Sequence, residues 1–200
     1  MSPAPLILAS ASAARGALLR NAGIAFTAAP ASIDENEIKA AFRAESRPAA
    51  ECATALAEAK AARVARRHPG SLVIGADQML VCDDVWFDKP ADLVAARAQL
   101  VALRGKRHEL ISALCVVRDG ERLWHFVDRS SLAMREFSDA FLDDYLAAVG
   151  DAVLGAVGAY HLEGRGVQLF ARIEGGYFAI LGLPLLPLLD FLRGHGVVAR

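Results

Sequence analysis

Short, uninterrupted apolar runs constrain the fold of this chain more than any other feature. Residues 6–9 and 72–76 consist of leucine, isoleucine, valine, alanine and one glycine, with no polar alternation. This pattern is typical of strands that are buried on both faces. Helical patterns over residues 13–22, 48–67 and 93–103 alternate with these runs. The chain is therefore expected to form an α/β fold, a mixed β-sheet with flanking helices.

The second half of the chain predicts a hairpin and two further helices. Two β-rich runs within residues 108–135 flank the pair Asp119-Gly120, a strong hairpin signal. Ser138 is a good cap for a helix over 139–149, and a leucine-rich helix is expected over 185–193. A strand is expected over 26–29 and a polar loop over 30–37. No repeat or linker divides the chain, so we expect one domain over residues 1–200.

The balance of charge argues against polymeric or membrane partners. The 22 basic and 23 acidic residues give a formal net charge of −1, and no long basic run indicates DNA or RNA binding. The apolar stretch 175–189 is shorter than the roughly 18–20 residues of a membrane span, and prolines interrupt it. No basic residue precedes Arg15, unlike in a signal peptide. Three scattered cysteines indicate reduced thiols, so we expect a cytoplasmic protein.

The turn Ser10-Ala11-Ser12 lies between the first strand and the first helix. Free N–H groups and the dipole at a helix start favour an anion, and the two hydroxyls and Arg15 would add donors to phosphate oxygens. The alternative is that Ser12 only caps the helix and Arg15 is a solvated surface charge. Both interpretations stay open from these residues alone.

Two acids and two lysines are further candidates. Asp77 directly follows the run 72–76, where α/β enzymes commonly place catalytic groups, and its carboxylate could bind Mg²⁺ or orient water. Glu35 in the polar loop could supply a second carboxylate. Lys60 and Lys89 are compact charges suited to polyphosphate. A turn-forming aspartate and ordinary solvated charges are the alternatives.

Familiar metal and nucleotide motifs are absent from the sequence. The five histidines lack the H-x-x-x-H and H-E-x-x-H spacings of zinc sites. There is no G-x-x-x-x-G-K-[ST] phosphate loop, and Gly164-Arg165-Gly166 is no dinucleotide fingerprint.

Several short motifs occur together in an order that carries a family resemblance. Residues 8–19 read LASASAARGALL against the pattern L-A-S-x-S-P-R-R-x-x-L-L. Further matches are Asp34-Glu35, LAEAKA (56–61), IGADQ (74–78), Lys89-Pro90, GAY (158–160), Glu163-Gly164, IEG (173–175) and GLP (182–184). From Leu6 to about Leu192, the chain closely resembles the Maf family of nucleotide pyrophosphatases.

The resemblance implies a fold with two lobes around a deep cleft and an enzyme that uses Mg²⁺ or Mn²⁺. Its substrate would be a nucleoside triphosphate, cut into nucleoside monophosphate and pyrophosphate. Asp77 would accept a proton and, with Glu35, hold the metal ion. Arg15, Lys60 and Lys89 would stabilise negative charge, and Ser10 and Ser12 would position phosphates.

Three positions depart from the commoner family pattern and bear on the choice of base. Ala14 replaces the first arginine of a pair, Gln78 stands where threonine is frequent, and Glu163 stands where glutamine is frequent. Gln78 and Glu163 resemble the subgroup acting on 7-methyl-GTP rather than the subgroup preferring dTTP and UTP. Gly176 and Ala179 also replace polar residues of the pattern, which leaves the role of that loop open.

Two functions of other classes compete with this hypothesis. The first is a nucleotide-binding regulator of cell division without turnover, in line with the family's link to septum formation. The second is a nucleotidyltransferase, which usually opens with a glycine-rich loop that Ser10-Ala11-Ser12 does not contain. A two-fold homodimer is the default expectation for the assembly.

Overall fold

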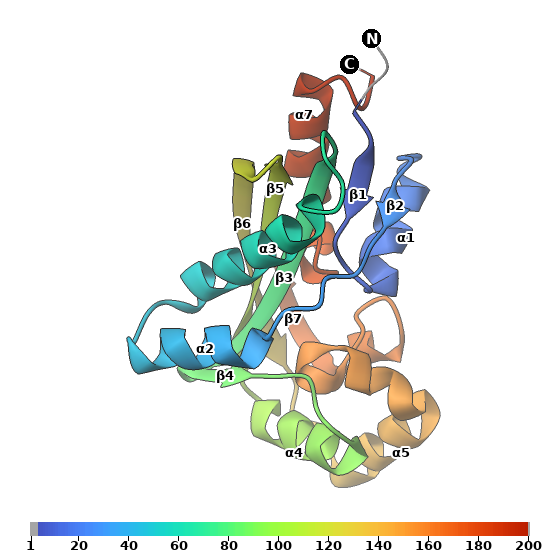
Figure 1. Ribbon diagram of the computed structural model, residues 1–200. Coiled ribbons are helices and arrows are strands. Elements are labelled where there is room, and N and C mark those ends of the chain that lie inside the picture. The colour runs from blue at the N-terminus through green and yellow to red at the C-terminus, as the bar shows by residue number, and fades with distance from the viewer. Residues whose placement is uncertain (1–3, 200) are drawn as a thin grey trace. The chain divides into compact units, whose positions relative to one another are not determined.

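A seven-stranded mixed sheet organises residues 4–199, the part of the chain described by the computed structural model (Figure 1). The strand order is β2-β1-β3-β5-β6-β7, and β4 pairs with β3. The pairs β1–β2 and β1–β3 are parallel, whereas β3–β4 and β6–β7 are antiparallel. The strands are β1 (Leu6–Leu8), β2 (Thr27–Ala28), β3 (Leu72–Cys82), β4 (Val85–Phe87), β5 (Arg107–Arg118), β6 (Glu121–Met134) and β7 (Phe170–Glu174). The predicted fold class, a mixed sheet with flanking helices, is confirmed.

The chain divides into two compact units. Unit 1 contains Met1–Asp77, Ser112–Asp128 and Gly176–Arg200, and unit 2 contains Gln78–Ile111 and Arg129–Gly175. The deep cleft and the single domain over residues 1–200 stay predictions.

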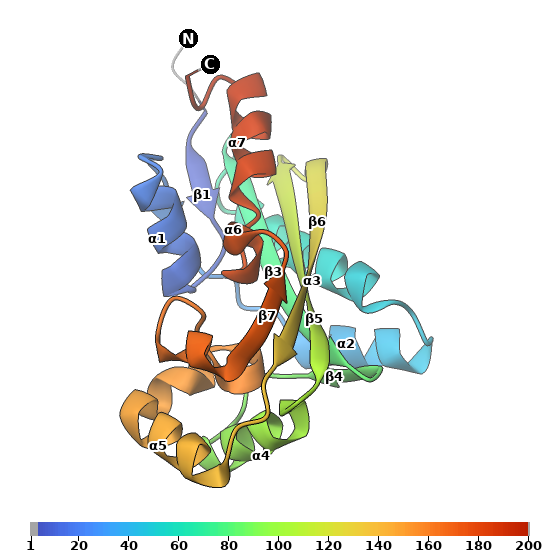
Figure 2. The same cartoon turned by 180° about the vertical axis from the view of Figure 1, so that it is seen from behind.

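Unit 1 buries the first part of the sheet on both faces. Its helices are α1 (Ala13–Asn21), α2 (Glu35–Ala44), α3 (Ala49–Ala65), α6 (Tyr177–Ile180) and α7 (Leu185–Gly194). On one face, Leu8 and Ile74 pack in a core with Leu19 of α1 and Leu188 of α7. On the other face, β1 and β3 pack against α3, which Figures 1 and 2 show on the side opposite α7. Burial on both faces explains the uninterrupted apolar runs.

Unit 2 contains the helices α4 (Leu93–Leu103) and α5 (Asp139–Val149), and three 3₁₀ segments. These segments are η1 (Gly150–Gly155), η2 (Val157–Ala159) and η3 (Arg165–Leu169). His108, Tyr160 and Phe170 form an aromatic cluster with ring centroids 4.8–6.0 Å apart. Burial lowers the pKa of His108 to about 4, and its Nε2 lies 2.8 Å from the Tyr160 hydroxyl.

Most predicted elements are confirmed. The helices expected over 13–22, 48–67, 93–103, 139–149 and 185–193 correspond to α1, α3, α4, α5 and α7. Strands β5 and β6 form the predicted hairpin, and both Asp119 and Gly120 have positive φ, as a type I′ turn requires. Within residues 4–199, no helix combines the length and apolar character that a membrane span requires.

Two expectations about local structure were wrong. The loop expected over 30–37 ends earlier, because Asp34 caps α2 by accepting a hydrogen bond from the Glu37 N–H, and Glu35 is the first helical residue. The strand expected over 72–76 does not end before Asp77. It continues to Cys82, since its second half pairs with β4, Leu80 opposite Phe87. Asp77 therefore lies inside β3 rather than beyond its end.

Candidate active site

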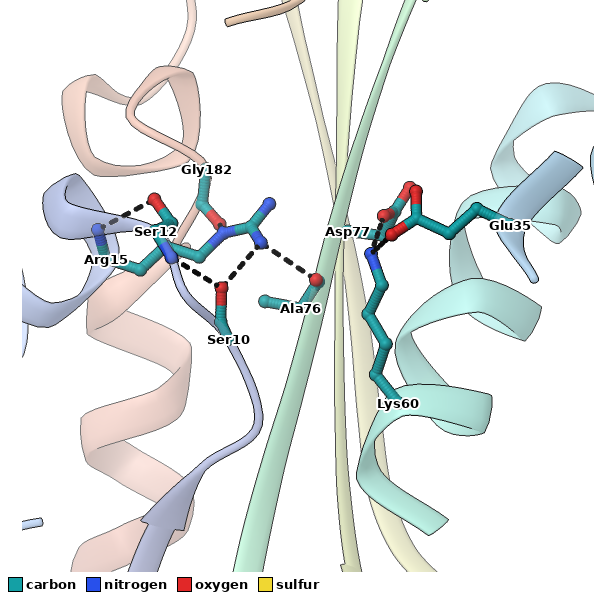
Figure 3. A network of polar contacts seen from close by, with 8 residues as sticks. All are labelled: Ser10, Ser12, Arg15, Glu35, Lys60, Ala76, Asp77 and Gly182. Carbon is teal, nitrogen blue, oxygen red and sulfur yellow. Dashed lines mark hydrogen bonds and ion pairs between the residues drawn. The ribbon is translucent and has the colours of Figure 1, made fainter. Parts of the chain in front are cut away.

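The guanidinium group of Arg15 connects three segments of unit 1 (Figure 3). Its Nε donates to the Gly182 carbonyl oxygen at 2.8 Å, and its Nη1 donates to the Ala76 carbonyl oxygen at 2.9 Å. Nη1 also donates to Ser10 Oγ at 3.3 Å. Arg15 therefore fastens the turn after β1, the strand β3 and the loop between α6 and α7. The interpretation of Arg15 as a solvated surface charge is wrong.

The local sequence explains how Arg15 reaches these acceptors. Ser12 caps α1, accepting a hydrogen bond from the Arg15 N–H at 3.4 Å, and the Ser12 N–H in turn donates to Ser10 Oγ at 3.2 Å. The parallel pairing of β1 with β3 brings the turn after β1 beside Ala76. Gly182 has a φ of +84°, and an added Cβ would lie 3.2 Å from Arg15 Nε. A glycine there lets the loop approach the guanidinium group.

Glu35, Lys60 and Asp77 form a second group, the acid–lysine cluster. Lys60 Nζ lies 2.8 Å from Glu35 Oε1 and 2.5 Å from Asp77 Oδ1. The side chains of Lys60 and Asp77 are only 11% and 7% exposed, whereas that of Glu35 is 43% exposed. Within residues 4–199, Asp77 Oδ2 is buried without a hydrogen-bond partner. Figure 3 shows this cluster and the Arg15 contacts on either side of β3.

Close packing of β3 on α3 positions the acid–lysine cluster. A Cβ added at Gly75 would collide with the carbonyl oxygen of Ala57 in α3, so only glycine permits this approach. Alternate residues of a strand point to the same face, so Asp77 points from the same face as Gly75. Lys60 follows Ala57 by three residues on α3 and therefore reaches the Asp77 carboxylate.

The environment of Asp77 makes it more basic than an ordinary aspartate. Burial raises the pKa of the Asp77 carboxyl, and the nearby Glu35 carboxylate adds to this rise. The Lys60 ammonium and the Arg15 guanidinium oppose it. For the cationic Arg15, burial has the opposite effect and lowers the pKa, and the negative charges of Asp77 and Glu35 oppose that change. A carboxylate of raised pKa is a better proton acceptor near neutral pH.

The acid–lysine cluster has the donor chemistry that a hard divalent cation requires. Mg²⁺ is commonly held by one or two carboxylates together with waters and substrate phosphates. Glu35 and Asp77 supply two carboxylates, and the unpartnered Asp77 Oδ2 supplies a buried oxygen donor. Within residues 4–199, no three His, Cys, Asp or Glu side chains form a group that could hold a metal ion by themselves. Two carboxylates suit a cation whose remaining ligands are waters or a bound anion.

The other predicted site residues are Ala14, Gln78, Lys89 and Glu163. Ala14 is partly buried in the first turn of α1. Gln78, Lys89 and Glu163 belong to unit 2. Gln78 follows Asp77 in β3, Lys89 is exposed in the loop after β4, and Glu163 Oε1 lies 3.8 Å from His161 Nδ1. The functional roles of all these residues stay predictions.

Two glycines of the site, Gly75 and Gly182, were missed as site residues from the sequence. Neither carries a functional side chain, but each allows a close approach that positions Lys60 or Arg15. A signal for Gly75 was present, because a lone glycine inside an apolar strand often marks a place where another backbone comes close. For Gly182 the only signal was its place in the GLP motif, since its contact with Arg15 joins residues 167 positions apart.

The fold and the candidate site define a class of protein. A mixed α/β sheet places cations and acids around one central strand, an arrangement suited to anionic substrates such as polyphosphates. A family model described as Maf-like protein matches residues 5–195. The chain belongs to the Maf family, and the resemblance stated from its motifs is confirmed.

Curated relatives align with this chain over nearly their whole length. A nucleoside triphosphate pyrophosphatase of Paramagnetospirillum magneticum is 59% identical, covering 95% of this chain and 98% of the relative. A protein of the same name from Granulibacter bethesdensis is 56% identical over 95% of this chain and 96% of its own. A 7-methyl-GTP pyrophosphatase of Brucella abortus biovar 1 is 48% identical over 94% of both chains.

Proposed function

We propose that the protein hydrolyses nucleoside triphosphates to nucleoside monophosphates and pyrophosphate. The names of the relatives support this activity. The observation that carries it is the acid–lysine cluster, in which two carboxylates converge on one buried ammonium group beside the Arg15-bound turn. A binding protein without turnover does not require a buried, basic carboxylate among cations.

In the proposed reaction, water attacks the α-phosphorus of the substrate. The Asp77 carboxylate accepts a proton from this water, which its raised pKa favours. The new bond joins the water oxygen to the α-phosphorus, and the bond from the α-phosphorus to the bridging oxygen breaks. Pyrophosphate leaves with the electron pair of that bond.

Cations of the site stabilise the negative charge that develops on the leaving pyrophosphate. Lys60 supplies an ammonium group beside Asp77, and Lys89 is proposed to supply another from unit 2. Arg15 uses Nε and Nη1 for contacts within the protein, so its Nη2 is the proposed contact to phosphate. Ser10, Ser12 and the first amides of α1 would position the phosphates.

Glu35 and Asp77 are the proposed ligands of Mg²⁺ or Mn²⁺. The bound cation would lower the pKa of the attacking water and offset the charge of the phosphates. Adding EDTA should abolish pyrophosphate release, and adding Mg²⁺ in excess should restore it.

The residues Ala14, Gln78 and Glu163 are proposed to select a guanine-type base, including 7-methylguanine. A carboxylate at Glu163 can accept hydrogen bonds from the N1–H and the exocyclic amine of guanine, whereas uracil offers one imide N–H. A carboxylate that the bound base covers and leaves without these partners is disfavoured. Glu163→Gln should reduce the kcat/KM ratio of 7-methyl-GTP to UTP at least tenfold, and an unchanged ratio would remove Glu163 from base selection.

Pyrophosphate release from a panel of GTP, 7-methyl-GTP, UTP and dTTP tests the activity. With Mg²⁺ present, at least one of these substrates should turn over, and Asp77→Asn should reduce its kcat by about 10²–10⁴-fold. Asp190→Asn, which changes an exposed aspartate of α7, is the matched control and should keep normal turnover. Near-normal turnover by Asp77→Asn would show that Asp77 is not the proton acceptor. No release from any substrate would favour the nucleotide-binding regulator instead.

The cellular setting is proposed from the same chemistry. A protein acting on free nucleoside triphosphates works where they are abundant, so we place it in the cytoplasm, without nucleic acid polymers as partners. A two-fold homodimer is the expected assembly. Light scattering coupled to size-exclusion chromatography would distinguish it from a monomer of 21.3 kDa.

A further inference from the structure

The ammonium group of Lys60 contacts the same two carboxylates that are proposed to hold the divalent cation. Its Nζ lies 2.8 Å from Glu35 Oε1 and 2.5 Å from Asp77 Oδ1, so both contacts are within hydrogen-bond distance. The Lys60 side chain is 11% exposed and the Asp77 side chain 7%, which limits screening by solvent. Lys60 therefore already neutralises part of the negative charge that would attract a metal ion.

A divalent cation and Lys60 cannot both gain the full attraction of these carboxylates. The acid–lysine cluster contains two negative charges and one positive charge. A divalent cation bound to both carboxylates would lie close to the ammonium group, and repulsion between like charges is strong where solvent is largely excluded. Without another anion, the ammonium group would lose its partners or the cation would bind weakly.

A triphosphate removes this conflict because it brings several negative charges of its own. The phosphate oxygens would offer the Lys60 ammonium group new partners and would supply further ligands to the cation. Lys60 would then move its contacts from the carboxylates to the phosphates, and the carboxylates would become available to the cation.

We propose that Lys60 competes with the divalent cation for Glu35 and Asp77, and thereby makes tight metal binding depend on the nucleotide. The inference rests on the proposed function, since it assumes a metal-bound triphosphate substrate. It assigns Lys60 a role before chemistry begins, in addition to its proposed stabilisation of charge during the reaction. The enzyme would bind free metal ions weakly and the metal–nucleotide pair tightly.

Metal affinity measured without turnover tests this role. Mn²⁺ binding to the wild-type protein and to Lys60→Met is followed by electron paramagnetic resonance, with and without α,β-imido-GTP, a substrate analogue that resists cleavage. Without nucleotide, Lys60→Met should bind Mn²⁺ at least tenfold more tightly than the wild type. The analogue should increase Mn²⁺ affinity much more in the wild type than in the variant, because only the wild type has an ammonium group that the phosphates can draw away from the carboxylates. Titration of Mn²⁺ into the analogue alone corrects for binding in solution.

The control variant is Lys106→Met, which removes another lysine whose ammonium group pairs with a carboxylate. Lys106 Nζ lies 3.0 Å from Asp83 in unit 2, and this variant should bind Mn²⁺ like the wild type. If Lys60→Met does not fold, Lys60→Gln replaces it, and the increase in Tm that Mn²⁺ causes is a second measure of affinity.

Three outcomes would overturn the inference. They are unchanged or weaker Mn²⁺ binding by the Lys60 variants, equal effects of the analogue in wild type and variant, and wild-type Mn²⁺ binding as tight without nucleotide as with it. Pyrophosphate release by the wild type is assayed separately. Turnover together with any of these outcomes refutes the competition alone, whereas absence of turnover on the whole substrate panel refutes the proposed function.

Discussion

Replacing Arg15 by methionine should destabilise the protein as well as reduce its activity. The wild-type guanidinium group donates to the Ala76 and Gly182 carbonyl oxygens at 2.9 and 2.8 Å, and to Ser10 Oγ. Methionine has a similar length and no donor. Both carbonyl oxygens would lose a charged donor in a partly buried environment.

The expected magnitude follows from these lost donors. A buried polar group left without a partner costs about 1–3 kcal/mol. Because the two hydrogen bonds to the carbonyl oxygens are only partly buried, losing both should lower the free energy of unfolding by about 2–4 kcal/mol. For a chain of this size, that corresponds to a fall in Tm of roughly 5–12 °C. The Ala76 carbonyl directly precedes Asp77, so the position of the Asp77 carboxylate should also become less defined, and kcat should fall.

Urea unfolding and kcat/KM are measured for Arg15→Met, Arg15→Lys and Arg20→Met. Arg15→Lys keeps the charge, but one ammonium group does not reproduce the planar fork that reaches three acceptors, so it should also be destabilised. Arg20→Met removes an exposed arginine of the same helix and serves as the control, with stability close to wild type. Wild-type stability of Arg15→Met combined with low activity would refute the reasoning, since Arg15 would then act on the substrate alone.

Two further predictions concern packing and pH. Gly75→Ala should lower the free energy of unfolding by about 1–3 kcal/mol in urea titrations, because its Cβ would collide with the Ala57 carbonyl oxygen. It should also lower kcat/KM by moving Lys60. Unchanged stability and unchanged kcat/KM would show that α3 can shift freely. The pKa of His108 is about 4 in the folded protein against 6.5 ordinarily, so below pH 6.5 the unfolded chain binds a proton that the folded protein does not. The free energy of unfolding should fall by up to about 3 kcal/mol as pH decreases from 6.5 to 4. The His108→Gln variant should lose less stability over this interval, whereas His125→Gln, which changes an exposed histidine, should behave like the wild type. Equal losses of stability in all three proteins would exclude His108 as the cause.

The fold was predictable where burial leaves a simple pattern in the sequence. The runs around Leu8 and Ile74 are apolar on both faces because helices cover both sides of β1 and β3, and the turn at Asp119 has strong local preferences. The length of β3 was not predictable, since the polar Asp77 and Gln78 interrupt its apolar run and the strand continues through pairing with strands distant in the sequence or formed after it, β5 and β4.

The candidate site was predictable in its residue types but not in its contacts. Ser10, Glu35, Lys60 and Asp77 were chosen from their chemistry and family motifs. The structure places the carboxylates of Glu35 and Asp77 each within hydrogen-bond distance of Lys60. The contacts of Arg15 could not be predicted, because backbone carbonyl groups are present at every residue and have no signature in the sequence. Only the folded chain brings those of two distant segments to one guanidinium group.

The alanines of α3 have a consequence for how this protein can vary. The helix buries Ala53, Ala57 and Ala61 completely, and Gly75 of β3 faces that same surface. A larger side chain at any of these positions would push α3 away from β3 and increase the distance between Lys60 and Asp77. Substitutions intended to thermostabilise the enzyme are therefore better directed to its solvent-exposed helix surfaces. Between α3 and β3, a larger side chain would also reduce activity.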